Sequence, residues 1–164
     1  MNLSKNFSKA ELCKSQTAIR MGLNNNPTDD QTENLRLLCE RVLQPVRDHF
    51  NQVVSISSGF RDPILSQKIG SSIDSQHCKG EAADLEIFGV ANNELADWIK
   101  ENLMFDQLIL EYHTPGEPNS GWVHVSYTKE INSNRKEYLM ATKNATGKTE
   151  YKQILGLSTD RYVK

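Results

Sequence analysis

Apolar residues recur at steps of three and four along residues 35–50, which is the spacing of one face of an amphipathic helix. The stripe consists of Leu35, Leu38, Val42, Val46 and Phe50. Residues 28–31 (TDDQ) have the pattern of a capping box, so we expect the helix to begin there. Pro45 should kink this helix or end its regular part, because proline lacks the N–H that a helical turn needs. A shorter helix is expected from the capping pattern SKAE at residues 8–11 to about Gly22.

Beyond residue 50 the pattern changes to the alternation that is typical of strands. Four segments are expected to be strands: 53–57, 82–88, 106–112 and 122–127. Asp62 and Pro63 provide a cap and a first-turn proline, which predict a short helix over 64–69. Helical spacing returns over 92–103. The turn-rich loop 114–121 suits the connection between two antiparallel neighbours.

The last part of the chain has a weaker pattern. Residues 137–142 and 149–153 are expected to form a hairpin around the NATG turn. Helices followed by strands with one intervening helix predict an α+β fold. A length of 164 residues predicts a single domain over residues 1–164.

The alternation within the strands also predicts which side chains share a face, because side chains of a strand point alternately to its two sides. The aliphatic positions expected to face the core are Ala83, Leu85, Ile87, Leu108, Leu110, Val123 and Val125. If they do, Asp84, Glu111 and His124 project together from the opposite side of one sheet. The same alternation would also place solvated polar residues on an open sheet face, so the pattern by itself leaves both interpretations open.

Composition and charge exclude several classes of function. Apolar residues make up 37% of the chain in short runs, so we expect no membrane-spanning helix. The net charge of −2 provides no basic field for a nucleic-acid backbone. Three cysteines without a CxxC pair do not predict a disulfide framework. Residues 1–7 lack the apolar stretch of a secretory signal, so we expect the protein to be made in the cytosol.

Four histidines are the most informative polar residues. His49 is expected to be structural near a helix end, and His113 to be a solvated loop residue. His77 precedes Asp84 by seven residues, and zinc takes imidazole nitrogen and carboxylate oxygen as ligands. Cys78 lies beside His77 and could bind a soft metal, but we interpret it as a small buried residue.

Four short motifs occur in order along the chain. They are SSGFR at residues 57–61, SQH followed by GEAAD within 75–84, FDQLILE at 105–111 and WVHVS at 122–126. Together they resemble the zinc D-alanyl-D-alanine carboxypeptidase family, and in particular its phage-type members that cleave peptides of bacterial cell walls. The resemblance spans about residues 6–127 and leaves 128–164 as a C-terminal extension. It implies the hedgehog/DD-peptidase fold, with an antiparallel sheet bearing the zinc site and the N-terminal helices packed on it.

The resemblance also implies roles for individual residues. One zinc ion is expected on His77, Asp84 and His124, and the arginine of the substrate-side motif corresponds to Arg61. Some members carry an acidic base three residues before the last ligand, where this chain has Gly121, and others carry a histidine two residues before it, where this chain has Trp122. The FDQLILE strand is similar to the one that supplies a catalytic glutamate in hedgehog-like relatives, so the base is expected at Glu111. Ser75 either binds substrate or caps its loop.

These expectations combine into a zinc metallopeptidase that hydrolyses peptide bonds of peptidoglycan. The alternatives are a carboxypeptidase or dipeptidase acting on small D-alanyl peptides, and an inactive zinc-binding module that recognises the wall. L-alanyl-D-glutamate, D-alanyl-meso-diaminopimelate and terminal D-alanyl-D-alanine bonds all suit the motifs. We expect a monomer that binds stem peptides, does not insert in membranes, and reaches the wall after release from the cell, as a phage or prophage product.

Overall fold

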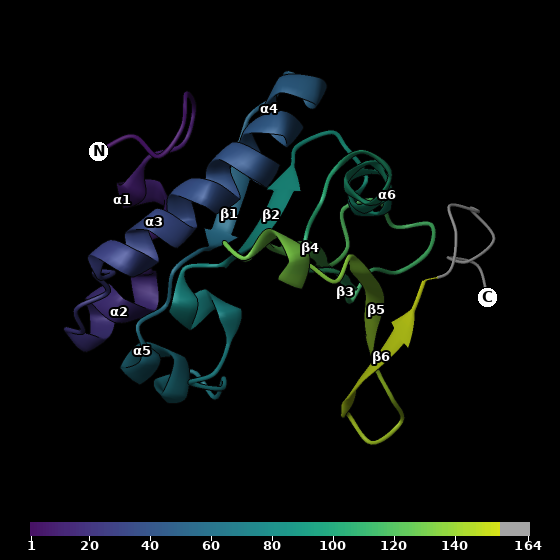
Figure 1. The fold of residues 1–164 in the computed structure, drawn as a ribbon. Helices are drawn as coiled ribbons and strands as arrows, with labels where there is room; N and C mark the ends of the chain where they lie inside the picture. Colours follow the sequence, from purple (N-terminus) through teal and green to yellow (C-terminus); the bar gives the residue numbers. More distant parts are fainter. Residues whose placement is uncertain (155–164) are drawn as a thin grey trace.

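A six-stranded sheet lies at the centre of the computed structural model, which describes residues 1–154 (Figure 1). Its order is β1-β2-β4-β3-β5-β6, with β1 (Val54–Ser58), β2 (Ala82–Ile87), β3 (Gln107–Glu111), β4 (Trp122–Ser126), β5 (Glu137–Lys143) and β6 (Thr149–Gln153). All neighbours are antiparallel except β3 and β5. The expected antiparallel sheet is confirmed for β1 to β4, whereas the parallel pair of β3 and β5 makes the whole sheet mixed. The chain returns to the start of β3 before β5 begins, and the Glu137 N–H bonds the Asp106 carbonyl there.

One long helical segment packs beside this sheet. It comprises α3 (Asp29–Leu38), the π-helical turn η1 (Cys39–Leu43) and α4 (Gln44–Phe50). Its capping box is confirmed, with the Thr28 hydroxyl and the Gln31 side chain each bonding the other residue's backbone N–H. The predicted interruption is confirmed too. Pro45 lies in the first turn of α4, directly after the wider π-helical turn in which the Gln44 N–H bonds the Cys39 carbonyl.

The helix predicted from residue 8 to Gly22 is instead two short helices, α1 (Lys9–Leu12) and α2 (Gln16–Met21). Ser15 separates them, because its backbone is extended and its hydroxyl accepts the Ala18 N–H as a new helix cap. The remaining helical elements are α5 (Pro63–Lys68), η2 (Gln76–Lys79), α6 (Asn92–Asn102) and η3 (Ile131–Ser133).

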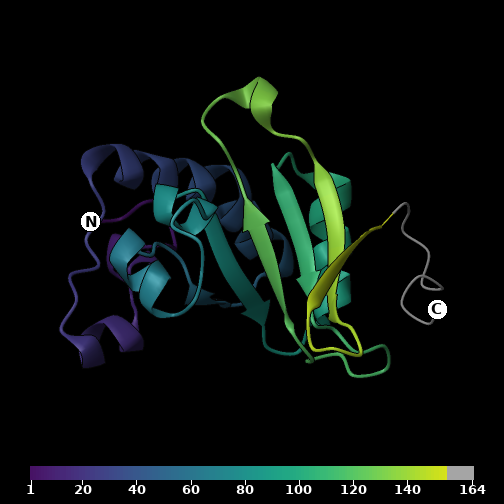
Figure 2. The ribbon, with the colours of Figure 1, turned by 90° about the horizontal axis from the view of Figure 1, so that it is seen from below.

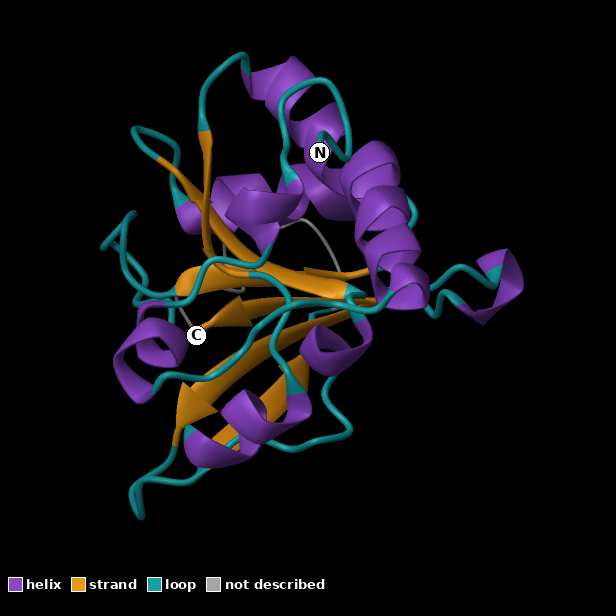
Figure 3. Ribbon diagram, turned by 90° about the vertical axis from the view of Figure 1, so that its left-hand side faces the viewer, coloured by secondary structure: helices purple, strands orange, loops and turns teal. Residues whose placement is uncertain are grey.

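The core fills the space between the sheet and the helices α3, α4 and α6, which lie behind the strands in Figure 2. It includes the seven aliphatic strand residues that were predicted to face inward, so the predicted parity is confirmed. Helices lie on two sides of the sheet (Figure 3), and the segment with α5 and η2 borders the face opposite this core. Among the described helices, none is both long and apolar enough to cross a bilayer.

The predicted C-terminal hairpin is confirmed as β5 and β6, which pair in antiparallel register from Leu139 with Gln153 to Lys143 with Thr149. Of the extension expected over residues 128–164, residues 155–164 lie outside the described part of the chain.

Candidate metal centre and its cleft

His77 is held on the short turn η2 with its ring directed at the sheet. The Ser75 hydroxyl accepts the His77 N–H at 3.2 Å, so Ser75 caps this turn. The residue is only 2% exposed, and its Nδ1 lies 2.7 Å from the Gly59 carbonyl. A carbonyl can only accept, so Nδ1 carries the proton and Nε2 presents a lone pair. Burial lowers the pKa of His77 and favours this neutral form.

Gly59, which orients His77, is itself packed on the N-terminal helices. A Cβ at residue 59 would lie 2.2 Å from the Leu12 carbonyl oxygen. The next residue, Phe60, donates its N–H to that same oxygen at 2.7 Å. Only glycine fits at residue 59, because its backbone lies directly against that of Leu12. This contact also positions the Gly59 carbonyl that accepts the hydrogen bond from His77.

A second anchor holds η2 against the start of β3. Gln76 donates its side-chain amide to Asp106 Oδ2 at 2.9 Å, and Arg135 holds both oxygens of the same carboxylate at 2.9 and 3.0 Å. Burial would raise the pKa of Asp106, but the hydrogen bonds from Arg135 outweigh it and keep the pKa low. The turn that carries His77 is thus fixed by Gln76 as well as by its cap at Ser75.

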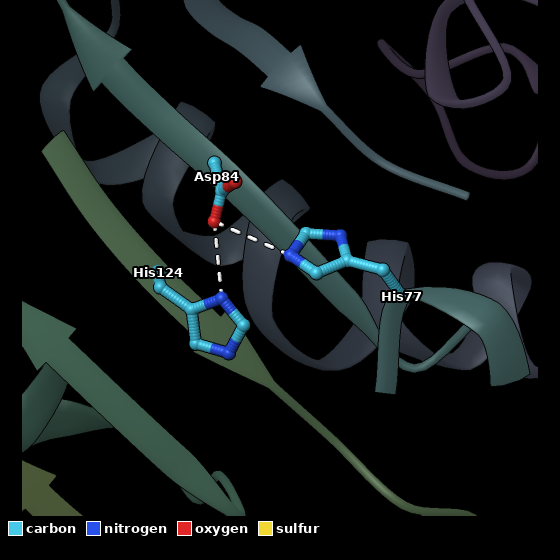
Figure 4. A group of neighbouring side chains, drawn as sticks. All are labelled: His77, Asp84 and His124. Carbon is cyan, nitrogen blue, oxygen red and sulfur yellow. Dashed lines mark hydrogen bonds and ion pairs between the residues drawn. The ribbon is translucent and has the colours of Figure 1, made fainter. Parts of the chain in front are cut away.

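Asp84 and His124 are direct partners on the adjacent strands β2 and β4. Asp84 Oδ1 lies 3.0 Å from His124 Nδ1 and 3.4 Å from His77 Nε2, and both rings direct a nitrogen at this one oxygen (Figure 4). Burial would raise the pKa of Asp84, but its hydrogen bond with His124 outweighs burial and holds the pKa well below its usual range. Asp84 is therefore an ionised carboxylate between two imidazoles.

These three residues meet the chemical requirements of a catalytic zinc site. Their ligand atoms lie within 4.8 Å of one another, and two nitrogens with one oxygen form a donor set that zinc accepts. The proton on His77 Nδ1 directs Nε2 to the cluster, as is common for metal-bound histidine. Cys78 is buried, directs its Sγ toward the Ser72 carbonyl, and is not part of the group.

A family model described as Peptidase M15 matches residues 5–126, which include all three of these residues. The chain belongs to the peptidase M15 family. This family is zinc-dependent, in agreement with the donor set. A search of curated proteins finds no match to this M15 peptidase.

Glu111 lies on β3, on the same face of the sheet as the metal-binding group of the peptidase. Its Oε1 is 4.0 Å from His124 Nδ1, and its side chain is 17% exposed. Burial raises the pKa of Glu111, against the opposing effect of His124. The common face predicted for Asp84, Glu111 and His124 is confirmed. The carboxylate stands beside the metal-binding group without belonging to it.

Gly121, at the position where the resemblance led us to look for an acidic base, cannot accept any side chain in this backbone. Its φ is +65°, and a Cβ there would lie 1.9 Å from the Glu111 carbonyl oxygen and 2.7 Å from the Tyr112 carbonyl carbon. The departure from the family pattern therefore has a steric reason, because the loop end at Gly121 lies directly on the backbone that carries Glu111.

Replacing Gly121 with alanine is expected to destabilise the M15 peptidase by about 2–5 kcal/mol, through positive-φ strain and backbone overlap. Denaturant unfolding measures the loss. Gly147→Ala is the matched control, because Gly147 also has a positive φ (+81°) but has nothing within 4 Å of its added Cβ. A loss no larger than that of Gly147→Ala would contradict the steric account.

The metal-binding group opens into a cleft of about 490 Å³, which we call the metal cleft. Its lining includes Arg61, Ser75, Gln107, Trp122 and Tyr151 as well as the residues above. Arg61 donates Nη1 to the Ser71 hydroxyl at 3.2 Å, while its buried Nε has no hydrogen-bond partner and the guanidinium forms no ion pair within residues 1–154. Arg61 also lines a second hollow of about 410 Å³, between α2 and β1.

Two histidines lie outside the centre. His49 stacks on Trp98 at 4.3 Å, in agreement with a structural role. His113 was predicted to be solvated but is only 6% exposed, because the loop after β3 folds back over it and brings the carbonyl of Ser120 to 3.2 Å from its Nδ1. Gln107 and Trp122 of the cleft could have been found from strand parity. No sequence pattern pointed to Tyr151.

Proposed function

We propose that this M15 peptidase hydrolyses peptide bonds in the stem peptides of bacterial peptidoglycan, with a single zinc ion on His77, Asp84 and His124. One observation carries the proposal: three zinc-type ligand atoms converge beside the carboxylate of Glu111 in an open cleft. Zinc bound there supplies a Lewis acid that polarises the scissile carbonyl and makes water a better nucleophile.

Glu111 is the proposed general base. It takes the proton of the attacking water and delivers it to the departing amine, the usual sequence for a carboxylate beside the reacting atoms. An inactive zinc-binding module would have no use for a half-buried carboxylate at this position. The placement of Glu111 therefore supports an enzyme over the recognition module.

Arg61 is the proposed substrate-binding cation. Its guanidinium faces the metal cleft without a carboxylate partner among residues 1–154, so it is available for a substrate carboxylate or for the developing oxyanion. Ser75 also lines the cleft, and its hydroxyl, which already caps η2, is the proposed second contact to substrate.

The choice of peptidoglycan rests on the motifs, which resemble phage-type wall peptidases of the hedgehog/DD-peptidase fold. The shape of the site supports cleavage within a longer peptide. Arg61 lines both the metal cleft and the hollow between α2 and β1, so we propose that a longer peptide extends from the reacting bond toward this second hollow. A carboxypeptidase releasing terminal D-alanine is the second candidate. We propose that the protein acts as a monomer on the wall after release from the cell, as a phage-derived endolysin does.

The test is digestion of purified sacculi by the zinc-loaded protein. We expect the turbidity to fall and mass spectrometry to show fragments with one new amino terminus, at a single type of bond. A zinc chelator should abolish this release, and added zinc should restore it. Release of free D-alanine without loss of turbidity would favour the carboxypeptidase, and intact sacculi with the metal bound would favour the recognition module.

A further inference from the structure

The hairpin of β5 and β6 follows the part of the chain that matches the M15 family, yet it continues the sheet that carries the site. The family match ends at residue 126, and β5 pairs in parallel with β3, the strand of Glu111. Gln107 of β3 donates to Glu137 of β5 at 2.7 Å. The hairpin therefore extends the sheet beyond β3 (Figure 1), and because its residue Tyr151 lines the metal cleft we call the hairpin the side wall of the cleft.

Side-chain contacts fix this wall to the residue next to Glu111. The hydroxyls of Tyr112 and Thr149 lie 2.6 Å apart, and Lys143 donates to the same threonine hydroxyl at 3.1 Å. The Lys143 ammonium also lies 5.3 Å from the centre of the Tyr112 ring, which in turn packs edge-on against Trp122 at 5.4 Å. The start of β6 is thereby held in a defined position relative to the candidate base.

The strand register brings one aromatic residue of the wall into the cleft. Glu111 pairs with Ala141, and Ala141 pairs with Tyr151, so the three form a row across the sheet. Ala141 has only a methyl group and is buried, so no large side chain separates the other two. Tyr151 lines the metal cleft while 57% of its surface is exposed. Burial and the charge of Glu111 raise the pKa of Tyr151, in keeping with this proximity.

Tyr151 lies on the side of the cleft where one half of the bound substrate is expected. Glu111 is proposed to protonate the departing amine, so the substrate that continues from Glu111 toward β6 is the leaving half. The backbone of β6 lies two strand spacings from that of β3, about 10 Å. One extended residue covers only about 3.5 Å. A leaving half of one residue therefore spans only about a third of the distance between the two backbones, and it leaves most of this part of the cleft unfilled.

We infer that Tyr151 is a specificity-determining residue that packs against a leaving half continuing for at least two residues beyond the cleaved bond. The inference rests on the proposed function, because it uses Glu111 to assign the direction of the substrate. The substrate is then a peptide that is cut internally, such as a cross-linked stem, rather than a peptide that loses one terminal residue. A tyrosine ring suits this role, since it offers a large rigid surface at low cost in conformational entropy.

The experiment compares two synthetic peptides with the same acyl half, one ending one residue and the other three residues after the cleaved bond. For Tyr151→Ala we expect KM for the longer peptide to rise about tenfold, with kcat within twofold of the parent and no change for the shorter peptide. Tyr151→Phe keeps the ring and should restore KM to within threefold. Lys152→Ala is the control, because Lys152 is the next residue of β6 and points to the other face.

Equal effects of Tyr151→Ala on both peptides, or no effect on either, would overturn the inference, as would a Tyr151→Phe variant as weak as Tyr151→Ala. A separate binding arm needs no cleavage. Zinc-loaded Glu111→Gln protein, with and without Tyr151→Ala, is titrated calorimetrically with stem peptides of increasing length. If the parent protein hydrolyses nothing, the proposed function fails, and the calorimetric titration alone tests the inference. The inference then requires that the affinity for peptide rises with peptide length in the protein that has Tyr151. In the Tyr151→Ala variant this rise must be absent.

Discussion

Replacing Glu111 with glutamine is expected to lower kcat by about three orders of magnitude while the zinc content stays at one ion per chain. The amide keeps the size and shape of the side chain but cannot accept the proton of water, and general bases contribute about 10²–10⁴-fold. Zinc should remain, because Glu111 lies outside the group of three ligand atoms. Peptide hydrolysis and elemental analysis of the same preparation provide the two measurements.

The matched control is Glu86→Gln. Glu86 lies on β2 two residues from Asp84 and accepts the Asn92 amide at 3.1 Å, a bond that the glutamine oxygen can still accept. This variant should keep both its activity and its zinc. If Glu111→Gln retained most of the activity, the base would have to be another group. If it lost zinc, Glu111 would instead belong to the metal centre.

Replacing His124 with alanine is expected to remove zinc and activity together. Two protein ligands remain, and a catalytic zinc site ordinarily has three. We expect zinc content to fall from one ion to near zero after dialysis and activity to fall by at least about 10⁴-fold. The measurements are metal analysis, competition with a chromogenic chelator, and hydrolysis.

Circular dichroism must show that His124→Ala is folded, since the ring is largely buried. His49→Ala is the control for loss of a histidine, because His49 stacks on Trp98 away from the centre. Its zinc content should equal that of the parent. Equal zinc in the parent and in His124→Ala would refute the ligand assignment.

The metal-binding face could be predicted because strand parity is a local property. Each of β2, β3 and β4 shows its inward aliphatic residues in the sequence, so the face of Asp84, Glu111 and His124 follows without knowledge of the strand order. The helix cap at Thr28 and the interruption at Pro45 were predictable for the same reason, since each depends on residues within one or two turns.

The features that were missed depend on contacts between distant segments. The parallel pairing of β5 with β3 follows from the path of residues 127–136, which carries no periodic pattern. The position of Tyr151 depends on that pairing and on the register of the hairpin. The burial of His113 requires the loop to fold back on it, which turn-forming residues alone do not specify.

The bond from His77 to the Gly59 carbonyl gives the amino-terminal segment a part in shaping the proposed metal site. Gly59 rests against the Leu12 carbonyl oxygen, which also accepts the N–H of Phe60, so α1 buttresses the peptide unit that orients the imidazole. The first dozen residues thus help to position the His77 ring at the proposed metal site. An insertion or fusion that displaced α1 would weaken zinc affinity from a distance, without touching a ligand.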